Sequence, residues 1–206
     1  MLSHLKILPN TNERYDEVLS VAAHLIARDG FERASIRAIA QEANLSQAGL
    51  YHYFSSKEDL LYQVQKHTFT ALRNSLACRL EASMPPIERF KLLIANHLEF
   101  FTAHMDELRV CAFEYQKLTG KYHDEVQVIR RDYFRIAHGI VKDVLDANGR
   151  GLQRRPDSKR ITMYLFGIIN WIHMWFDTER RTDVDVIASE IAEMVLFGIA
   201  GKGEKK

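Results

Sequence analysis

Apolar residues recur about three and four positions apart through most of the chain, which is the spacing of one face of an α-helix. In the first such segment, Val18, Ala22, Leu25 and Ile26 share a face, and Gly30 follows where a helix can end. No stretch of the sequence alternates apolar and polar residues in the way that a half-buried strand would. The pattern therefore predicts an all-α protein.

The next segment predicts two short helices that are joined by a tight turn. The first begins at Ser35, and Asn44 then stands where a left-handed backbone is expected, which Asn tolerates. Ser46 can cap the second short helix, which is expected to end near Phe54. These proportions are typical of a helix-turn-helix.

Longer helices are expected in the rest of the chain. Ser56 can cap the first of them, which stops before Pro85, and Pro86 suits the start of the next. Further helices are predicted at residues 106–118, 123–147, 157–176 and 184–200. The prediction is three short N-terminal helices followed by a bundle of about six longer ones, with a loop at residues 147–157 and a frayed tail.

A run of adjacent rings closes the helix-turn-helix segment. Tyr51, His52, Tyr53 and Phe54 are contiguous, whereas a helix that buries its aromatic residues separates them by about three or four positions. We expect Leu50 and Phe54 to face the core, which leaves the other three rings near the outer face. The alternative is that all of these rings pack against the following helix.

The expected outer face has the chemistry of a helix that enters the major groove of DNA. Ala48 and Gly49 permit a close approach, and Gln47 can both donate to and accept from an adenine edge. Hydroxyl and imidazole groups further along the helix can reach phosphates. This face therefore predicts a DNA-recognition helix.

The composition restricts where DNA could bind. With 28 Lys and Arg against 27 Asp and Glu in 206 residues, the chain is not generally basic, so a nucleic-acid surface must be a local patch. Cys78 and Cys111 stand alone, without the spacing of a zinc site, and are expected to be reduced thiols.

No sequence pattern predicts catalysis, a cofactor or a metal site. The chain lacks G-x-S-x-G, H-E-x-x-H and phosphate-loop patterns. His97 and His104 could share a helix face, and His123, Asp124 and Glu125 could hold a cation, but such residues more often belong to a core or a surface. We therefore expect no enzyme, no cofactor and no metal.

The sequence also predicts a cytoplasmic protein that does not associate with membranes. Residues 1–17 have no long apolar run of the kind found in secretory signals. The most apolar segment, residues 163–176, is shorter than the roughly 20 residues that a membrane span needs.

Residues 14–61 resemble the TetR-like (tetracycline-repressor-like) transcriptional regulators, chiefly in the segment AAHLIARDGFERASIRAIAQEANLSQAGLYHYFSSKEDLL. The positions that match the family's spacing are Gly30, Phe31, Ser35, Arg37, Ile39, Ala40, Ala43, Ser46, Leu50, Tyr51, Tyr53, Phe54, Lys57 and Leu60. Two features depart from the family pattern. Asn44 stands where Gly is common, and Ala48-Gly49 replaces a Gly followed by Ser or Thr, which removes one hydroxyl that could contact DNA.

The resemblance implies a division of roles along the helix-turn-helix. Residues that would hold phosphates are Ser35, Tyr53 and Lys57. Residues that would face bases or the adjacent backbone are Arg37, Gln47, Ala48, Gly49, Tyr51 and His52. Lys57 also begins a helix, where free N–H groups favour a phosphate.

The resemblance further implies two domains, a DNA-binding domain at residues 1–60 and a helical ligand-binding and dimerisation domain at residues 61–206. The last two helices would form a homodimer that binds a near-palindromic double-stranded operator. Candidate interface residues are Trp175, Ile187, Ile191, Met194, Val195 and Phe197. The alternative is that these side chains form the core of a monomer.

The bundle is expected to enclose a small-molecule effector. Candidate pocket residues are Phe100, Phe101, Met105, Phe113, Tyr115, Tyr133, Phe166 and Trp171. The runs RRDYFR at 130–135 and IINWIHMWFD at 168–177 resemble a branch of the family that senses acyl-coenzyme A thioesters. In that branch Arg130, Arg131 and Arg135 would meet coenzyme A phosphates, although a charge run on a helix is more often a solvated face.

The function expected from these observations is a ligand-responsive transcriptional repressor, released from its operator by an effector such as an acyl-coenzyme A. One alternative is a helical module that binds a small molecule or a protein and has no sequence-specific DNA binding. Another is an enzyme built on a helical bundle. Salt-dependent, sequence-selective DNA binding separates the repressor from both alternatives, and turnover identifies the enzyme.

Overall fold

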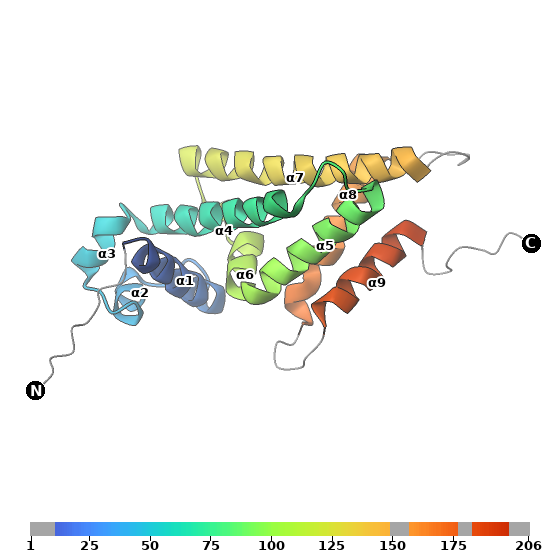
Figure 1. Ribbon diagram of the computed structural model, residues 1–206. Coiled ribbons are helices and arrows are strands. Elements are labelled where there is room, and N and C mark those ends of the chain that lie inside the picture. The colour runs from blue at the N-terminus through green and yellow to red at the C-terminus, as the bar shows by residue number, and fades with distance from the viewer. Residues whose placement is uncertain (1–10, 149–156, 177–182, 198–206) are drawn as a thin grey trace, which may run out of the picture.

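The computed structural model describes residues 11–148, 157–176 and 183–197. All regular elements of this part are helical, which confirms the all-α prediction (Figure 1). In chain order they are α1 (Thr11–Asp29), α2 (Ile36–Glu42), α3 (Gln47–Tyr53), α4 (Lys57–Arg79), α5 (Pro86–Ala103), α6 (Met105–Phe113), the 3-10 helix η1 (Tyr115–Lys117), α7 (Gly120–Asn148), α8 (Ser158–Asn170), the 3-10 helix η2 (Trp171–Met174) and α9 (Val184–Phe197). The tail and most of the loop predicted at 147–157 lie outside the described residues.

Local capping positions the short helices as predicted. The hydroxyls of Ser35, Ser46 and Ser56 each accept a hydrogen bond of 2.9–3.0 Å from the backbone N–H three residues later. Each bond satisfies an N–H group that has no partner within its helix, which is worth about 1 kcal/mol. Asn44 has a φ of 53°, so the tight turn between α2 and α3 uses the left-handed backbone expected there.

The N-terminal helices share a core with the bundle. Ala40, Leu50 and Phe54 are buried beneath α2 and α3, as predicted. Val110 of α6 and Val126 of α7 belong to the same apolar cluster. The helix-turn-helix therefore packs directly on the bundle. A displacement of α6 would change the packing of the N-terminal core.

Helix α5 is central to the bundle. It contacts α4, α6, α7, α8 and α9, and α7 lies along α4 (Figure 1). Phe90 and Phe101 of α5 are almost completely buried in the larger apolar cluster, which α9 also joins through Ile187 and Ile191.

Two of the predicted helices are interrupted. The helix expected at 106–118 ends at Phe113 and continues as η1, which lets Leu118 return to the N-terminal core. The helix expected at 157–176 ends at Asn170, where the Nδ1–H of His173 donates to the Asn170 carbonyl at 2.7 Å and the chain tightens into η2.

Candidate DNA-binding surface and ligand cavity

Helix α3 presents a mixed polar and aromatic face. Gln47, Ala48 and His52 are exposed, and Tyr51 keeps 51% of its surface, whereas Phe54 keeps 2%. The contiguous rings are therefore divided between solvent and core, with Tyr51 outside and Phe54 inside. This face lies at one end of the molecule, far along the chain and in space from α9 (Figure 1).

Gly49 lies directly beside the Ser46 hydroxyl that caps the N-terminus of α3. A Cβ atom at Gly49 would lie 3.3 Å from the Ser46 hydroxyl, which accepts the Gly49 N–H. A larger residue would press on this cap, which gives the Ala48-Gly49 departure a structural role. Ser35 and Arg37, at the start of α2, are exposed.

Tyr53 and Lys57 lie where the helix-turn-helix meets α1 and the turn after it. The half-buried Tyr53 ring lies 6.4 Å from that of Tyr15. The Lys57 ammonium donates to the Glu32 carbonyl at 3.0 Å and lies 4.6 Å from the centre of the Phe31 ring. These contacts hold the Lys57 ammonium against the turn after α1, while its backbone begins α4, where a phosphate would be favoured.

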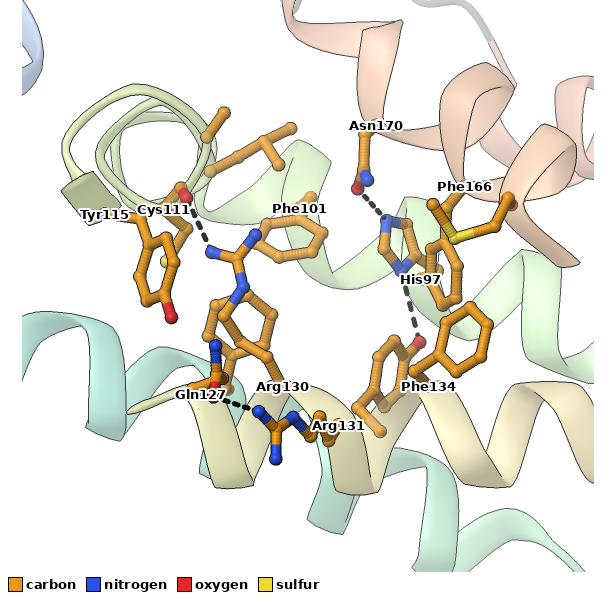
Figure 2. A pocket seen from close by; sticks show the side chains of 15 residues that line it. His97, Phe101, Cys111, Tyr115, Gln127, Arg130, Arg131, Phe134, Phe166 and Asn170 are labelled. Atoms are coloured by element: carbon orange, nitrogen blue, oxygen red, sulfur yellow. Dashed lines mark hydrogen bonds between the residues drawn. The ribbon is translucent and has the colours of Figure 1, made fainter. Parts of the chain in front are cut away.

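A cavity of about 570 Å³ lies between α5, α6, α7 and α8, and its size is typical of small-molecule sites (Figure 2). Rings from several helices point into it, and a few polar groups interrupt the apolar wall. Four of the predicted pocket residues line it, namely Phe101, Tyr115, Tyr133 and Phe166.

The other four predicted pocket residues lie elsewhere. Phe100 lines a separate cavity beside α1 and α4, and Met105 packs against the bundle core. Phe113 and Trp171 are 60% and 56% exposed, and both rings contact His173. Phe113 is the last residue of α6 and Trp171 is the first of η2, so both lie at the ends of helices that had been expected to continue.

Sequence reasoning missed a buried polar chain in the cavity wall. His97 Nδ1 lies 3.1 Å from the Tyr133 hydroxyl, and Nε2 lies 3.1 Å from the Asn170 Oδ1 (Figure 2). Burial lowers the pKa of His97 to about 3, so the imidazole is neutral. Since Asn170 Oδ1 can only accept, Nε2 carries the proton and Nδ1 accepts from Tyr133. A polar residue within an apolar helical face was the available signal, and the sequence predicted a core or surface position for His97 without its partners Tyr133 and Asn170.

Arg130 closes another part of the wall. It donates to the Cys111 carbonyl at 2.9 Å, and its guanidinium lies 4.5 Å from the centre of the Tyr115 ring and 5.0 Å from that of Phe69. Stacked arginines of this kind are held in place and still have N–H groups to offer. Burial raises the pKa of the Cys111 thiol to about 12, so this cysteine is not a reactive thiolate.

The three arginines of the 130–135 run do not act as a group. Arg131 lines the cavity but is itself exposed, and it donates to Gln127. Arg135 does not line this cavity and pairs with Asp132 at 2.8 Å. Only two of the three therefore face the space where a ligand could lie.

Helix α6 connects the cavity with the DNA-binding helices. Cys111 of α6 lines the cavity, and other parts of the same helix contact α1. Glu114 accepts the backbone N–H of Phe31 at 3.1 Å, and Asp106 pairs with His24 of α1 at 2.8 Å. A ligand that moves α6 would therefore change contacts on both sides.

The predicted interface residues divide between core and surface. Ile187 and Ile191 are buried in the chain's own core, Val195 is half-buried against it, and the exposed members are Trp175, Met194 and Phe197. Other apolar side chains of α8, η2 and α9 are also more than half exposed, namely Met163, Tyr164, Trp171, Met174 and Val186, and Met163 also lines the cavity. Many exposed apolar side chains on the same helices are typical of an interaction surface.

Among the described residues there is no group of three or more His, Cys, Asp or Glu side chains that could hold a metal ion. Cys78 and Cys111 are free thiols. None of the described helices is both long enough and apolar enough to span a bilayer.

An exposed recognition helix on a bundle with an internal cavity defines the class of ligand-responsive helix-turn-helix proteins. Residues 18–64 match the family description "Bacterial regulatory proteins, tetR family", and residues 83–199 match "Tetracyclin repressor-like, C-terminal domain". The chain belongs to the TetR family of transcriptional regulators, which confirms the resemblance inferred from the sequence.

Relatives and solved structures agree with this assignment. The chain is 20% identical to the Fatty acid metabolism regulator protein of Bacillus subtilis (strain 168), over 92% of this chain and 97% of that one. A TetR-family transcriptional regulator from Bordetella parapertussis 12822 is 25% identical with a TM-score of 0.81, covering 93% and 97%. AibR in complex with isovaleryl coenzyme A and operator DNA is also 25% identical, with a TM-score of 0.76 and coverage of 88% and 97%.

Proposed function

We propose that this protein is a homodimeric repressor that binds a near-palindromic operator and is released when an organic effector occupies the cavity. The observation that carries the proposal is that α6 borders the cavity and also contacts the N-terminal unit, through Asp106 on α1 and through its C-cap Glu114 on the turn after α1. Residues 1–60 would form the DNA-binding domain and residues 61–206 the effector-binding and dimerisation domain.

The DNA contacts are proposed from exposure and chemistry. Gln47, Tyr51 and His52 would face bases or the adjacent backbone, together with Arg37 and the small Ala48-Gly49 pair. Phosphate contacts are proposed for Ser35, Tyr53 and Lys57. The capped turn of α3 and its exposed polar face support this reading.

The dimer is proposed to form through the exposed apolar surface of α8, η2 and α9. Two copies related by a two-fold axis would present two recognition helices, which matches the symmetry of a near-palindromic site. Trp175, Met194 and Phe197 would contribute to this interface, whereas Ile187 and Ile191 would support it from within the protomer.

An acyl-coenzyme A is the proposed effector class. AibR, which is similar over most of this chain, has been solved with isovaleryl coenzyme A and operator DNA. Arg130 and Arg131 at the cavity would receive the anionic end, and the aromatic wall would receive the acyl end. For release, this ligand must bind the DNA-free conformation better than the DNA-bound one, and a coupling of about 1–3 kcal/mol is typical.

The protein would act in the cytoplasm, where the operator is, and would carry out no turnover. Its relatives are named as transcriptional regulators, which supports a binding function over an enzymatic one. A second candidate, a small-molecule-binding module without sequence-specific DNA binding, predicts equal affinity for all DNA sequences.

Selection of double-stranded DNA from a random pool tests the proposal. The wild type is expected to enrich a near-palindromic site, and Gln47→Ala should change the preferred base at one position per half-site, at about 1–3 kcal/mol. Acyl-coenzyme A thioesters, free fatty acids, aromatic acids and organic cations are then titrated against the selected complex. No enriched sequence would reject the repressor, and release only by cations or free acids would reject the thioester effector.

A further inference from the structure

The polar groups that line the cavity differ in their exposure to solvent. Arg131 is exposed and marks the solvent side, whereas His97 and Tyr133 are each at most 2% exposed and mark the buried side. Figure 2 shows Arg130 and the His97 chain on opposite sides of the cavity. A ligand held at its anionic end by the arginines would place its other end against His97, Tyr133 and Asn170.

The buried side is built from aromatic surfaces around this polar chain. The His97 ring centre lies 4.8 Å from that of Phe101 and 5.9 Å from that of Phe166, and Phe134 stacks on Phe166 at 5.9 Å. A hydrocarbon would suit these surfaces. Polar groups buried among such surfaces are costly unless they are paired, so the hydrogen bonds that they leave unused are the ones that a ligand would have to satisfy.

The hydrogen bonds among His97, Tyr133 and Asn170 leave one donor and one acceptor available to a ligand in the cavity. Neutral His97 has a single donor and a single acceptor, and both are used. Tyr133 donates its O–H to His97, so its oxygen remains available as an acceptor. The Asn170 amide nitrogen donates no hydrogen bond to the described part of the protein, so it remains available as a donor. Reversing the Asn170 amide would exchange these roles, and the cavity would still meet one donor and one acceptor.

Only some ligand groups can satisfy such a pair. A carboxylate can only accept, and the uncharged His97 offers it no compensating charge in this buried place. An alkyl group satisfies neither Tyr133 nor Asn170 after it displaces water, so both would be left unpaired. A hydroxyl group both donates and accepts, and can pair with either residue in either amide orientation.

We infer that a neutral hydroxyl on the inner end of the effector pairs with Tyr133 or with Asn170, which lie at opposite nitrogens of His97, so that the effector class is a hydroxylated acyl or aroyl group. This inference rests on the proposed function for the anionic end, which would remain a coenzyme A thioester. His97 holds these two side chains in place from between them. A site that hydrogen-bonds a ligand hydroxyl discriminates strongly against the analogue that lacks it, because its own polar groups are then left unpaired.

Matched ligand pairs test the inference on the full-length protein. Dissociation constants are measured by calorimetry for butyryl- against 3-hydroxybutyryl-coenzyme A, and for benzoyl- against 3- and 4-hydroxybenzoyl-coenzyme A. For at least one pair, the hydroxylated member is expected to bind roughly tenfold tighter or more. Each pair is also measured as the free acids, so that the hydroxyl preference is tested separately from the thioester.

Variants then locate the preference. Of Tyr133→Phe and Asn170→Ala, the variant that removes the partner of the hydroxyl should reduce the affinity ratio within a pair toward one, while the unhydroxylated member reports whether the cavity remains intact. Phe134→Leu, a control in the same wall, should change both members alike and preserve the ratio.

The outcomes separate the two hypotheses. Ratios within about twofold for every pair, or an unchanged ratio in both Tyr133→Phe and Asn170→Ala, would overturn the hydroxyl inference, even if thioesters release the operator. A hydroxyl preference seen only among free acids would retain the inference and reject the thioester. Failure of every compound to bind would overturn both.

Discussion

Two surfaces of this protein expose aromatic rings to a similar extent, yet their surroundings differ. Tyr51 on α3 is 51% exposed and Trp171 on η2 is 56% exposed. Around Tyr51 lie Gln47 and His52, which can hydrogen-bond to DNA, whereas the other apolar side chains that are more than half exposed on α8, η2 and α9 are methionines, a valine, a tyrosine and a tryptophan. The exposure of a ring does not identify its partner, but the polarity of its neighbours does.

The surfaces also differ in how they are built. The α3 surface depends on local features, namely the Ser46 cap, the left-handed Asn44 and the buried Leu50 and Phe54. The α8–α9 surface depends on which side of each helix is covered by the rest of the bundle. Local features can be predicted from a sequence, whereas the side of a helix that other helices bury cannot be predicted in the same way.

The largest effect is expected from a charge on the apolar surface. Tyr164 is 62% exposed on α8, so Tyr164→Glu should fold, but in a dimer it would bury two carboxylates at several kcal/mol per ion. Sedimentation should show monomers at micromolar concentration, with operator affinity lost in parallel. Val128→Glu, on the exposed side of α7, provides the matched control and should remain dimeric. A Tyr164→Glu dimer of wild-type stability would contradict the proposed interface.

A second prediction separates the two adjacent kinds of ring on the DNA side. Phe54→Ala removes a ring that is 2% exposed and lies 5.4 Å from Tyr15, and should cost about 3–5 kcal/mol of unfolding free energy. Tyr51→Ala should change stability by no more than about 0.5 kcal/mol and should weaken operator binding. Denaturant unfolding and DNA titration measure the two effects. Equal loss of stability in both variants would place Tyr51 in the core instead.

Much of the N-terminal architecture could be predicted from the sequence because its determinants are near one another in the chain. Ser46, Asn44 and Gly30 act within a few residues, and the period of Leu50 and Phe54 identifies the inner face. The all-α class followed from the apolar period for the same reason. Which of these residues contact DNA remains a prediction.

The cavity was less accessible to sequence reasoning because it depends on where helices end. Phe113 and Trp171 have the apolar character of a pocket residue, but they lie at the breaks after α6 and α8 and are more than half exposed. Conversely, His97 and Asn170 are 73 positions apart, and only the folded bundle brings them to 3.1 Å. Ile187 and Ile191 show a similar ambiguity, because an apolar stripe on a helix can be buried either in the core of one protomer or in a dimer interface.

A third prediction compares a buried histidine with an exposed one. The pKa of His97 in the folded protein is about 3, below its ordinary value of 6.5, so the unfolded chain binds a proton first as the pH falls below 6.5. Stability should therefore decrease by up to about 1.4 kcal/mol per pH unit below 6.5, until about pH 3, with no such slope above 6.5. Denaturant unfolding of wild type and His97→Gln isolates this slope.

The matched control for that experiment is His52→Gln, because His52 is exposed on α3. It should retain the acid-induced loss of stability, whereas His97→Gln should reduce it. If all three proteins lose stability equally between pH 6.5 and 5, His97 is not the group responsible.

The smallest effect is expected from Lys57, where one charge is removed beside the recognition helix. The Lys57 ammonium already donates to the Glu32 carbonyl at 3.0 Å and has further N–H groups for a phosphate. Lys57→Ala should weaken binding to all DNA sequences alike and make the salt dependence of the logarithmic binding constant shallower by about 0.9, the contribution of one phosphate. Lys142→Ala removes an equal charge from the exposed side of α7 and should leave that slope unchanged. Because Gln47→Ala is expected to change base preference without changing the slope, the three variants separate phosphate contact, base contact and net charge. An unchanged slope in Lys57→Ala would mean that Lys57 only anchors the Glu32 turn and that the phosphate contact must be sought at Ser35 or Tyr53.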